Sequence, residues 1–381
     1  MFNLKQNLLK EPGKRLASAL IMMAYLCSFA SNAGSETIPV PAFNMPKYSA
    51  YLSKESVDGL KQQEALMNKA HAACNPYSLK FDNTMGNQVE AAKAEANAIR
   101  ECEAKKYAVI MPEALKKFNV NITPKVIDGV QTDIISPKNG VPEALQGRVL
   151  INLHGGGFKY GGRFGGQLES MPIAHAHGYK VISIDYRKAP EYRFGAANDD
   201  VEKVYRYLLK TYAPESIGIF GCSAGSRVAG QAIVHIAKQG LPVPGAATFL
   251  CSAPTGLNGD SNYFAAAITS REPLHIGMVQ YWEGLSSDNE DAFPGDFEKT
   301  LKMFPPSLLI TSSRDYSLSP MISMHTKLMA LNKVSELHIF EGFSHAQFLS
   351  MYVPESRQTV DLMHRFFSRH LGHGKDDEKP E

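Results

Sequence analysis

The chain has 381 residues, of which 44% are hydrophobic and 20% are charged, as in an ordinary globular protein. This composition excludes a fibrous, low-complexity or wholly disordered chain, and the length predicts one large domain with additions, or two domains. The formal net charge is only +2, so no large excess of positive charge indicates a nucleic-acid partner.

Residues 1–33 have the pattern of a secretory signal peptide. Basic residues precede an apolar stretch over 16–30, and Ser31 and Ala33 are the small residues that a cut after Ala33 requires. The stretch is short for a membrane span, although an uncleaved anchor is the alternative. Cleavage would remove four basic residues and one acidic residue and leave a net charge of −1. We therefore expect a secreted or periplasmic protein with no nucleic-acid partner and no stable membrane anchor.

Two segments precede the first predicted strand. Residues 34–48 are rich in proline and predict an irregular lead-in. Residues 50–118 predict helices, because Ala, Glu and Lys are frequent and apolar positions recur at helical spacing. Cys74 and Cys102 fall in this helical segment, and an oxidising compartment allows disulfides. We predict that these two cysteines are bonded.

From about residue 121 the pattern changes to α/β. Short apolar runs rich in Val and Ile alternate with helix-length segments, which predicts a mainly parallel sheet. Two earlier runs on either side of Gly129 predict a leading antiparallel pair. Cys222 and Cys251 each end one of the apolar runs, and the sequence leaves open whether they are bonded neighbours or buried thiols. The six later runs read RVLINLH, KVISIDY, SIGIFG, AATFLC, SLLITSS and SELHIF.

A glycine-rich loop follows the first of these later runs. Residues 151–166 read INLHGGGFKYGGRFGG. A phosphate-binding P-loop needs a lysine and a hydroxyl residue that are missing after Gly162, and a dinucleotide-binding loop needs a glycine where Tyr160 stands. The remaining interpretation is a loop whose backbone N–H groups stabilise an oxyanion.

The segment Gly221-Cys222-Ser223-Ala224-Gly225 has the G-x-S-x-G pattern of a nucleophile elbow. An apolar strand precedes it and helix-forming residues follow it, which is the context that such an elbow requires. We predict that Ser223 is a nucleophile. Backbone N–H groups of Gly156, Gly157 and Ala224 would then stabilise the oxyanion, with Gly155 shaping the turn.

A nucleophilic serine needs a histidine and an acid, in the chain order Ser, Asp or Glu, His. Asp315 follows the apolar run SLLITSS, and His345 lies in a loop after the last run. Both positions are at carboxyl ends of strands, where ligands gather in open α/β sheets. We predict that His345 transfers the proton of Ser223 and that Asp315 orients the imidazole.

These motifs together resemble the hormone-sensitive-lipase-like branch of the α/β-hydrolases, which are carboxylic ester hydrolases. The resemblance spans about residues 130–370. It implies an α/β-hydrolase fold with a mostly parallel eight-stranded sheet flanked by helices, a cap built partly from the N-terminal helices, and no cofactor or metal. The matching blocks are HGGGF (154–158), DYRKAPEYRFGAANDD (185–200), GCSAG (221–225), SSRDYSL (312–318) and GFSHAQF (342–348).

The resemblance sets the expected organisation of the chain. We predict a signal peptide over 1–33, a lead-in and helical cap segment over 34–120, a catalytic domain over 121–371 and a disordered tail over 372–381. The chain departs from the family pattern at three positions. Cys222 stands where the family usually has Asp, Ser226 where it has Gly, and Gly195 where it has Pro.

The predicted activity is hydrolysis of esters with small or medium acyl chains through an acyl-enzyme. The same machinery would serve a carbohydrate deacetylase, a formamidase or an exopeptidase, and a non-catalytic binding protein of this fold is a further alternative. We expect a small ester as the substrate, and the sequence leaves open whether the chain forms a homodimer. His154 is expected to order the glycine-rich loop, and His175 and His177 to be a solvated pair without a metal.

Overall fold

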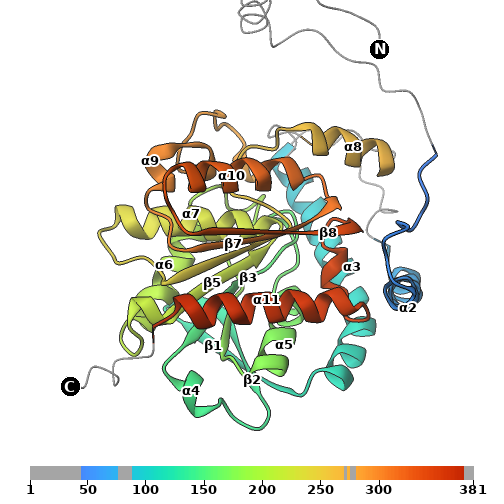
Figure 1. Ribbon diagram of the computed structural model, residues 1–381, viewed down its shortest axis with the longest axis horizontal. Coiled ribbons are helices and arrows are strands. Elements are labelled where there is room, and N and C mark those ends of the chain that lie inside the picture. Colours follow the sequence, from blue (N-terminus) through green and yellow to red (C-terminus); the bar gives the residue numbers. More distant parts are fainter. Residues whose placement is uncertain (1–43, 76–87, 270–272, 275–279, 373–381) are drawn as a thin grey trace, which may run out of the picture. The chain divides into compact units, whose positions relative to one another are not determined.

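The computed structural model describes residues 44–75, 88–269, 273–274 and 280–372 (Figure 1). The predicted signal peptide and all of the predicted tail except Gly372 lie outside these residues. The chain divides into two compact units, 1–46 and 47–381, and the description below concerns the second. In the described part, none of the helices combines the length and the apolar character needed to cross a bilayer.

A single eight-stranded sheet forms the centre of the second unit, in the order β1-β2-β4-β3-β5-β6-β7-β8. The pairs β1–β2 and β2–β4 are antiparallel, and all other neighbours are parallel. The predicted fold class, the leading antiparallel pair and all six later strands are thereby confirmed. The strands are β1 (Val120–Ile127), β2 (Val130–Pro137), β3 (Val149–Leu153), β4 (Val181–Ile184), β5 (Ile217–Cys222), β6 (Ala246–Leu250), β7 (Ser307–Arg314) and β8 (Ser335–Ser344).

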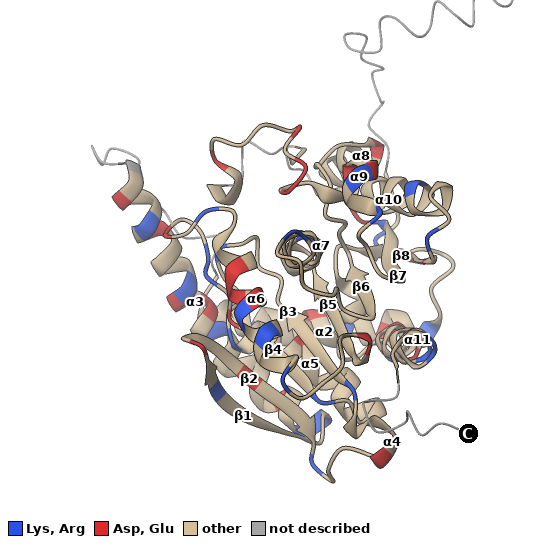
Figure 2. Cartoon of the chain, turned by 90° about the vertical axis from the view of Figure 1, so that its left-hand side faces the viewer, with Lys and Arg blue, Asp and Glu red and all other residues tan. Residues whose placement is uncertain are grey.

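Helices cover both faces of this sheet, as Figures 1 and 2 show. The longer ones are α2 (Lys54–Ala73), α3 (Gln88–Lys117), α5 (Phe164–His177), α6 (Ala196–Leu208), α7 (Ala224–Lys238), α8 (Asp260–Thr269), α10 (Leu318–Ala330) and α11 (Pro354–His370). Single turns occur at α4 (Glu143–Gln146), α9 (Glu298–Leu301), η2 (Pro214–Ser216), η4 (Gln280–Trp282), η5 (Pro294–Asp296) and η6 (Gln347–Leu349).

The central strands are buried on both faces, so they read as continuous apolar runs. Successive side chains point to opposite faces. Ile219 of β5 packs in the core beneath α6, α7 and α10, whereas the next residue, Phe220, packs in the core beneath α5 and α11. Strands β3, β5 and β6 carry no charged residue, and the positions coloured as charged residues in Figure 2 lie mainly on the surrounding helices. This two-sided burial holds the carboxyl ends of the strands in fixed positions.

The two N-terminal helices are tied to each other and to the far end of the chain. A disulfide joins Cys74, which ends α2, to Cys102 of α3, as the sequence predicted. A Cβ at Gly59 of α2 would lie only 2.3 Å from the carbonyl oxygen of Tyr352, so the helix backbone rests directly on that segment. Ser56 of α2 also donates a hydrogen bond of 2.6 Å to Glu355. These contacts fix the position of helix α2 beside the segment that follows His345.

Candidate active site

Ser223 occupies a sharp turn between β5 and α7. Its backbone angles are φ 57° and ψ −120°, which a residue with a side chain adopts only when its surroundings enforce it. The Ser223 amide donates to the carbonyl oxygen of Leu250 at 3.0 Å, which fixes the turn against the end of β6. The turn lifts the hydroxyl away from the sheet at the amino end of a 15-residue helix.

The glycines on either side of Ser223 are required by close packing of backbone. A Cβ at Gly225 would lie 1.8 Å from the carbonyl oxygen of Leu153 at the end of β3. A Cβ at Gly221 would lie 2.4 Å from the carbonyl carbon of Gly225. Any side chain at either position would push the turn off the neighbouring strand. The G-x-S-x-G pattern thus has a steric cause in this chain.

The structure brings Ser223, His345 and Asp315 together from three separate segments. His345 Nε2 lies 2.9 Å from the Ser223 hydroxyl, and His345 Nδ1 lies 2.9 Å from Asp315 Oδ1. The Asp315 side chain is fully buried, while that of His345 is 27% exposed. A buried carboxylate that accepts the Nδ1 proton leaves Nε2 free to accept the serine proton.

Asp315 is held by its own turn. The Ser317 amide donates to Asp315 Oδ1 at 2.9 Å, and the Thr311 hydroxyl donates to Oδ2 at 3.3 Å. The guanidinium of Arg227 is buried nearby, and burial lowers its pKa to about 10, so it stays charged at neutral pH. Asp315 and Asp296 are among the negative charges that act on this guanidinium.

Tyr316 is a residue of the site that the sequence did not single out. Its ring stacks on the His345 ring with centroids 4.3 Å apart, and its hydroxyl lies 3.2 Å from Nε2. The only sequence signal was its position next to Asp315. The stacking covers one face of the imidazole, and the hydroxyl is a second polar neighbour for Nε2.

The glycine-rich loop runs past Ser223 directly after β3. A Cβ at Gly155 would lie 3.4 Å from the Ser223 Cβ, so the two backbones are in near contact. Gly156 has φ 117°, and a Cβ there would lie 2.2 Å from the carbonyl oxygen of Tyr160. In the described part of the chain, the amides of Gly156 and Gly157 donate to no protein acceptor. They are therefore available to a ligand.

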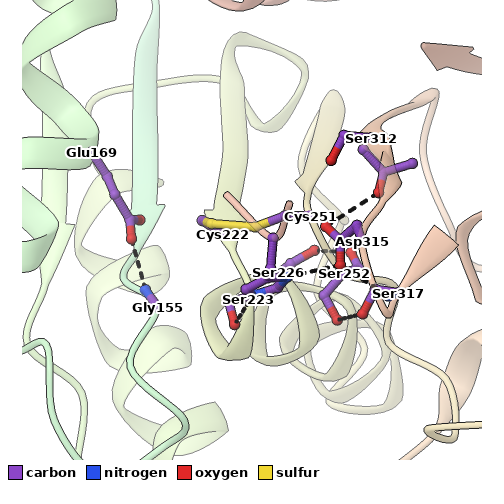
Figure 3. The surroundings of a disulfide bond; sticks show 12 residues. Gly155, Glu169, Cys222, Ser223, Ser226, Cys251, Ser252, Ser312, Asp315 and Ser317 are labelled. Atoms are coloured by element: carbon purple, nitrogen blue, oxygen red, sulfur yellow. Dashed lines mark hydrogen bonds and ion pairs between the residues drawn. A yellow bond between two sulfur atoms is a disulfide. The ribbon is translucent and has the colours of Figure 1, made fainter. Parts of the chain in front are cut away.

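Glu169 anchors this loop from α5. Its carboxylate accepts a hydrogen bond of 2.8 Å from the Gly155 amide and one of 3.2 Å from the Asn152 side chain. Figure 3 shows the first of these contacts beside the elbow. Burial raises the pKa of Glu169 to about 7. The Gly155 amide is thus used within the protein and differs in this from the amides of Gly156 and Gly157.

His154 also orders the loop. Its Nδ1 donates to the Gly155 carbonyl oxygen at 2.6 Å, and its own carbonyl oxygen accepts from the Tyr186 hydroxyl at 2.6 Å. The ring is fully buried and stacks on Tyr186 with centroids 4.3 Å apart. Burial lowers the pKa of His154, so the ring is neutral at pH 7. These contacts make it a positioning residue, as the sequence suggested.

A second disulfide joins Cys222 to Cys251 directly beside the elbow (Figure 3). The sequence did not decide whether these two cysteines form a disulfide or are free thiols. Cys222 ends β5 and Cys251 follows β6, so the bond links two neighbouring strands at their carboxyl ends. Both side chains are buried, at 4% and 0% exposure. The bond thereby fixes the residue before the candidate nucleophile.

The expectation of a solvated pair holds for His175, which is exposed, and is wrong for His177, whose side chain is 14% exposed. His175 Nδ1 accepts from the Asn119 amide at 3.1 Å, while His177 Nε2 lies 2.7 Å from Asp361 and its ring stacks on His364. The partners of His177 belong to α11, which packs against α5, whereas the partner of His175 lies just before β1. No group of three or more His, Cys, Asp or Glu side chains within the described ranges has the arrangement of a metal site.

The comparisons with known proteins agree with this geometry. A family model described as alpha/beta hydrolase fold matches residues 150–349, which is more than half of the chain. The chain belongs to this α/β-hydrolase family. The motif resemblance described above is thereby confirmed.

Individual relatives of this α/β-hydrolase are named as esterases or acetyl-hydrolases. An acetyl-hydrolase of Streptomyces hygroscopicus is 34% identical over 114 residues, which cover 30% of this chain and 38% of the relative. An esterase of Acinetobacter venetianus is 24% identical over 252 residues, which cover 63% of this chain and 80% of the relative. The chain thus spans well under half of the acetyl-hydrolase. The crystal structure of an esterase has a TM-score of 0.72 and 25% identity, covering 88% of this chain and 99% of that one.

Proposed function

We propose that this α/β-hydrolase is a serine hydrolase that cleaves carboxylic esters with small to medium acyl chains. The observation that carries the proposal is the position of His345, whose two ring nitrogens lie 2.9 Å from Ser223 and 2.9 Å from Asp315. The esterase and acetyl-hydrolase names of several relatives favour an ester over an amide as the substrate.

In the first half of the reaction, the Ser223 oxygen attacks the ester carbonyl carbon while His345 Nε2 takes the serine proton. The carbonyl oxygen becomes an oxyanion beside the amides of Gly156, Gly157 and Ala224. Each correctly placed donor of this kind lowers the barrier by about 3–4 kcal/mol. The carbon–oxygen bond to the alcohol then breaks, and His345 gives its proton to the departing alcohol oxygen.

The second half of the reaction repeats these steps with water. His345 takes a proton from a water molecule, whose oxygen attacks the acyl carbon bound to Ser223. The bond to the serine oxygen breaks, that oxygen regains a proton from His345, and the acid leaves. Asp315 orients His345 through Nδ1 and stabilises the imidazolium that forms in each half.

The test is labelling of the purified chain with a fluorophosphonate probe, combined with turnover of short p-nitrophenyl esters. We expect the label on Ser223 in a peptide map, and we expect Ser223→Ala to lose both label and turnover while its circular dichroism is unchanged. Ser287→Ala, which changes an exposed serine, is the matched control and should behave as the unmodified protein. Full turnover by Ser223→Ala would remove Ser223 from the mechanism.

We also propose that the chain works outside the cytoplasm, after cleavage of residues 1–33. The two disulfides support this, because such bonds persist in oxidising compartments. Amino-terminal sequencing of the protein from fractionated cells should give Gly34 as the first residue of an exported form. Recovery of the uncleaved chain in the cytoplasm with reduced cysteines would contradict this.

A further inference from the structure

A cavity of about 630 Å³ opens between α2 and the segment that carries His345. Gln63, Met67 and Asn68 line it from α2, and His345 and Ser350 line it from the opposite side. The α2 residues recur at a spacing of three and four, so they belong to one face of that helix. His345 lines this cavity and its Nε2 lies 2.9 Å from the Ser223 hydroxyl, so the cavity and the candidate nucleophile share this histidine as a neighbour.

The α2 wall of the cavity is held in place by contacts with the segment that follows His345. The Ser350 hydroxyl donates to Gln63 Oε1 at 3.0 Å. The backbone contact of Gly59 with Tyr352 and the hydrogen bond of Ser56 with Glu355 fix the same helix one and two turns earlier. A wall that is already ordered costs little to arrange when a ligand binds.

The lining combines apolar surface with uncharged hydrogen-bonding groups. Leu60, Met67 and Leu349 supply the apolar part, while Gln63, Asn68 and Gln347 supply amide groups. Lys47 and Glu64 stand at the cavity as an ion pair of 2.8 Å, and their side chains are 67% and 41% exposed. These two charges neutralise each other, and the other ionisable side chains of the lining are His71 and His345. The lining therefore offers mainly uncharged hydrogen-bonding groups and apolar surface.

The direction of proton transfer assigns this cavity to one half of the ester. His345 must give its proton to the oxygen of the departing alcohol, so the alcohol has to lie on the side of His345. We propose that the cavity binds the alcohol part of the substrate, and that this alcohol is a polyol with several free hydroxyl groups. This inference rests on the function proposed above.

Other alcohols suit the lining less well. A long alkyl alcohol would desolvate the amides of Gln63 and Asn68 without giving them hydrogen-bond partners, which costs affinity. A charged alcohol would find Lys47 and Glu64 already paired with each other. A polyol presents hydroxyl groups to the amides and its C–H surface to Leu60 and Met67, so it matches both parts of the wall.

The experiment compares two acetates whose branched alcohols are of similar size and differ in polarity: 2,3-dihydroxypropyl acetate and isobutyl acetate. The ratio of their kcat/KM values is measured for the full chain, with p-nitrophenyl acetate as a common reference reaction. We expect the dihydroxypropyl ester to be preferred by about tenfold or more. We expect Gln63→Leu and Asn68→Leu each to reduce that preference by about tenfold, mainly through KM.

Gln62→Leu is the matched control, because Gln62 is the same residue type one position away, is exposed, and does not line the cavity. It should keep the ratio of the unmodified protein. Two results would overturn the polyol assignment and leave the esterase proposal standing, provided that p-nitrophenyl acetate is hydrolysed. One is a preference for the isobutyl ester. The other is a ratio of kcat/KM values that stays unchanged in both Leu variants. Failure to hydrolyse any of the three esters, with no fluorophosphonate label, would overturn the esterase proposal and this inference with it.

Discussion

The two disulfides sit in regions of very different character, although they close chain segments of nearly the same length. Cys74 and Cys102 are separated by 28 residues and join the N-terminal helices, while Cys222 and Cys251 are separated by 29 residues and join two central strands. The restriction that each bond places on the unfolded chain is therefore almost equal. Any difference between them must come from the folded surroundings.

The surroundings of the two disulfides have different proposed roles. The sheet region holds the reacting groups on strand ends buried on both faces, where a small displacement would separate Ser223 from His345. Helix α2 supplies one wall of the proposed alcohol cavity, and in the described part of the chain neither N-terminal helix forms a hydrogen bond with the three candidate catalytic residues. We expect changes in the sheet region to act on kcat, and changes in the helices to act on substrate preference.

The largest expected effect is that of Asp315→Asn. This change leaves the shape of the side chain intact but favours the wrong imidazole tautomer, and by analogy with serine triads it should lower kcat by about 10⁴-fold. Asp58→Asn, at an exposed position of α2, is the control from the other region and should leave kcat unchanged. Steady-state kinetics with p-nitrophenyl acetate decide this, and a loss below tenfold for Asp315→Asn would mean that another acid orients His345.

Removal of each disulfide tests the comparison directly. Replacing either pair of cysteines with alanine should lower the free energy of unfolding by about 3–4 kcal/mol, because the closed loops are alike. Only the Cys222→Ala/Cys251→Ala variant should also lower kcat, by about tenfold, because only that bond fixes the residue before Ser223. Denaturant unfolding and kinetics at a temperature where both variants are folded separate the two effects. An equal loss of kcat in the Cys74→Ala/Cys102→Ala variant would contradict the division between the regions.

Glu169→Gln should change how stability depends on pH. Burial raises the pKa of Glu169 to about 7, above its usual 4.5. Folding therefore favours the protonated form, so this group destabilises the protein increasingly as pH rises from about 4.5 through 7. Gln cannot ionise, and the variant should gain about 1–3 kcal/mol relative to the unmodified protein between pH 5 and pH 8. Urea unfolding at several pH values measures the free energy of unfolding of both proteins. If their difference does not change with pH, Glu169 has the same pKa in the folded and the unfolded chain, which would contradict this prediction.

Tyr316→Phe should have the smallest effect. The ring keeps its stacking on His345, but the hydroxyl at 3.2 Å from Nε2 is lost. A single hydrogen bond of this kind corresponds to about 0.5–1.5 kcal/mol, so kcat should change by no more than about tenfold. Tyr316→Ala also removes the stacking and should have the larger effect. The reverse order in steady-state kinetics would assign the hydroxyl a role in proton transfer.

The strands and the three candidate catalytic residues could be predicted because their signals are local. Six apolar runs marked the parallel strands, and Ser223, Asp315 and His345 each follow such a run. Contacts between distant segments produce no comparable local pattern in the sequence. The stacking of Tyr316 on His345 and the anchoring of Gly155 by Glu169 depend on how helices and loops pack onto the finished sheet. The same holds for His177, whose partner Asp361 lies 184 residues further along the chain.

The pairing of Cys222 with Cys251 lies between these cases. Both cysteines were placed at the ends of strands, but the strand order was not known, so the bond stayed open. Once β5 and β6 are neighbours in register, with Cys222 opposite Leu250, the two sulfur atoms come within reach. Sheet order is thus the information that sequence patterns lacked here.

The packing of α2 against the segment around Tyr352 and Glu355 has a consequence for the order in which the chain folds. Ser56 and its partner Glu355 are 299 residues apart. Helix α2 is therefore synthesised early but can pack against its partner segment only after the end of the chain has been synthesised. Contacts of such separation form late in folding, because most of the intervening chain has to be ordered first. The sheet and its strand ends can therefore be complete while the polar wall of the cavity is still missing. In a chain that emerges from its amino end, selectivity for the alcohol would be acquired only at the final step of folding.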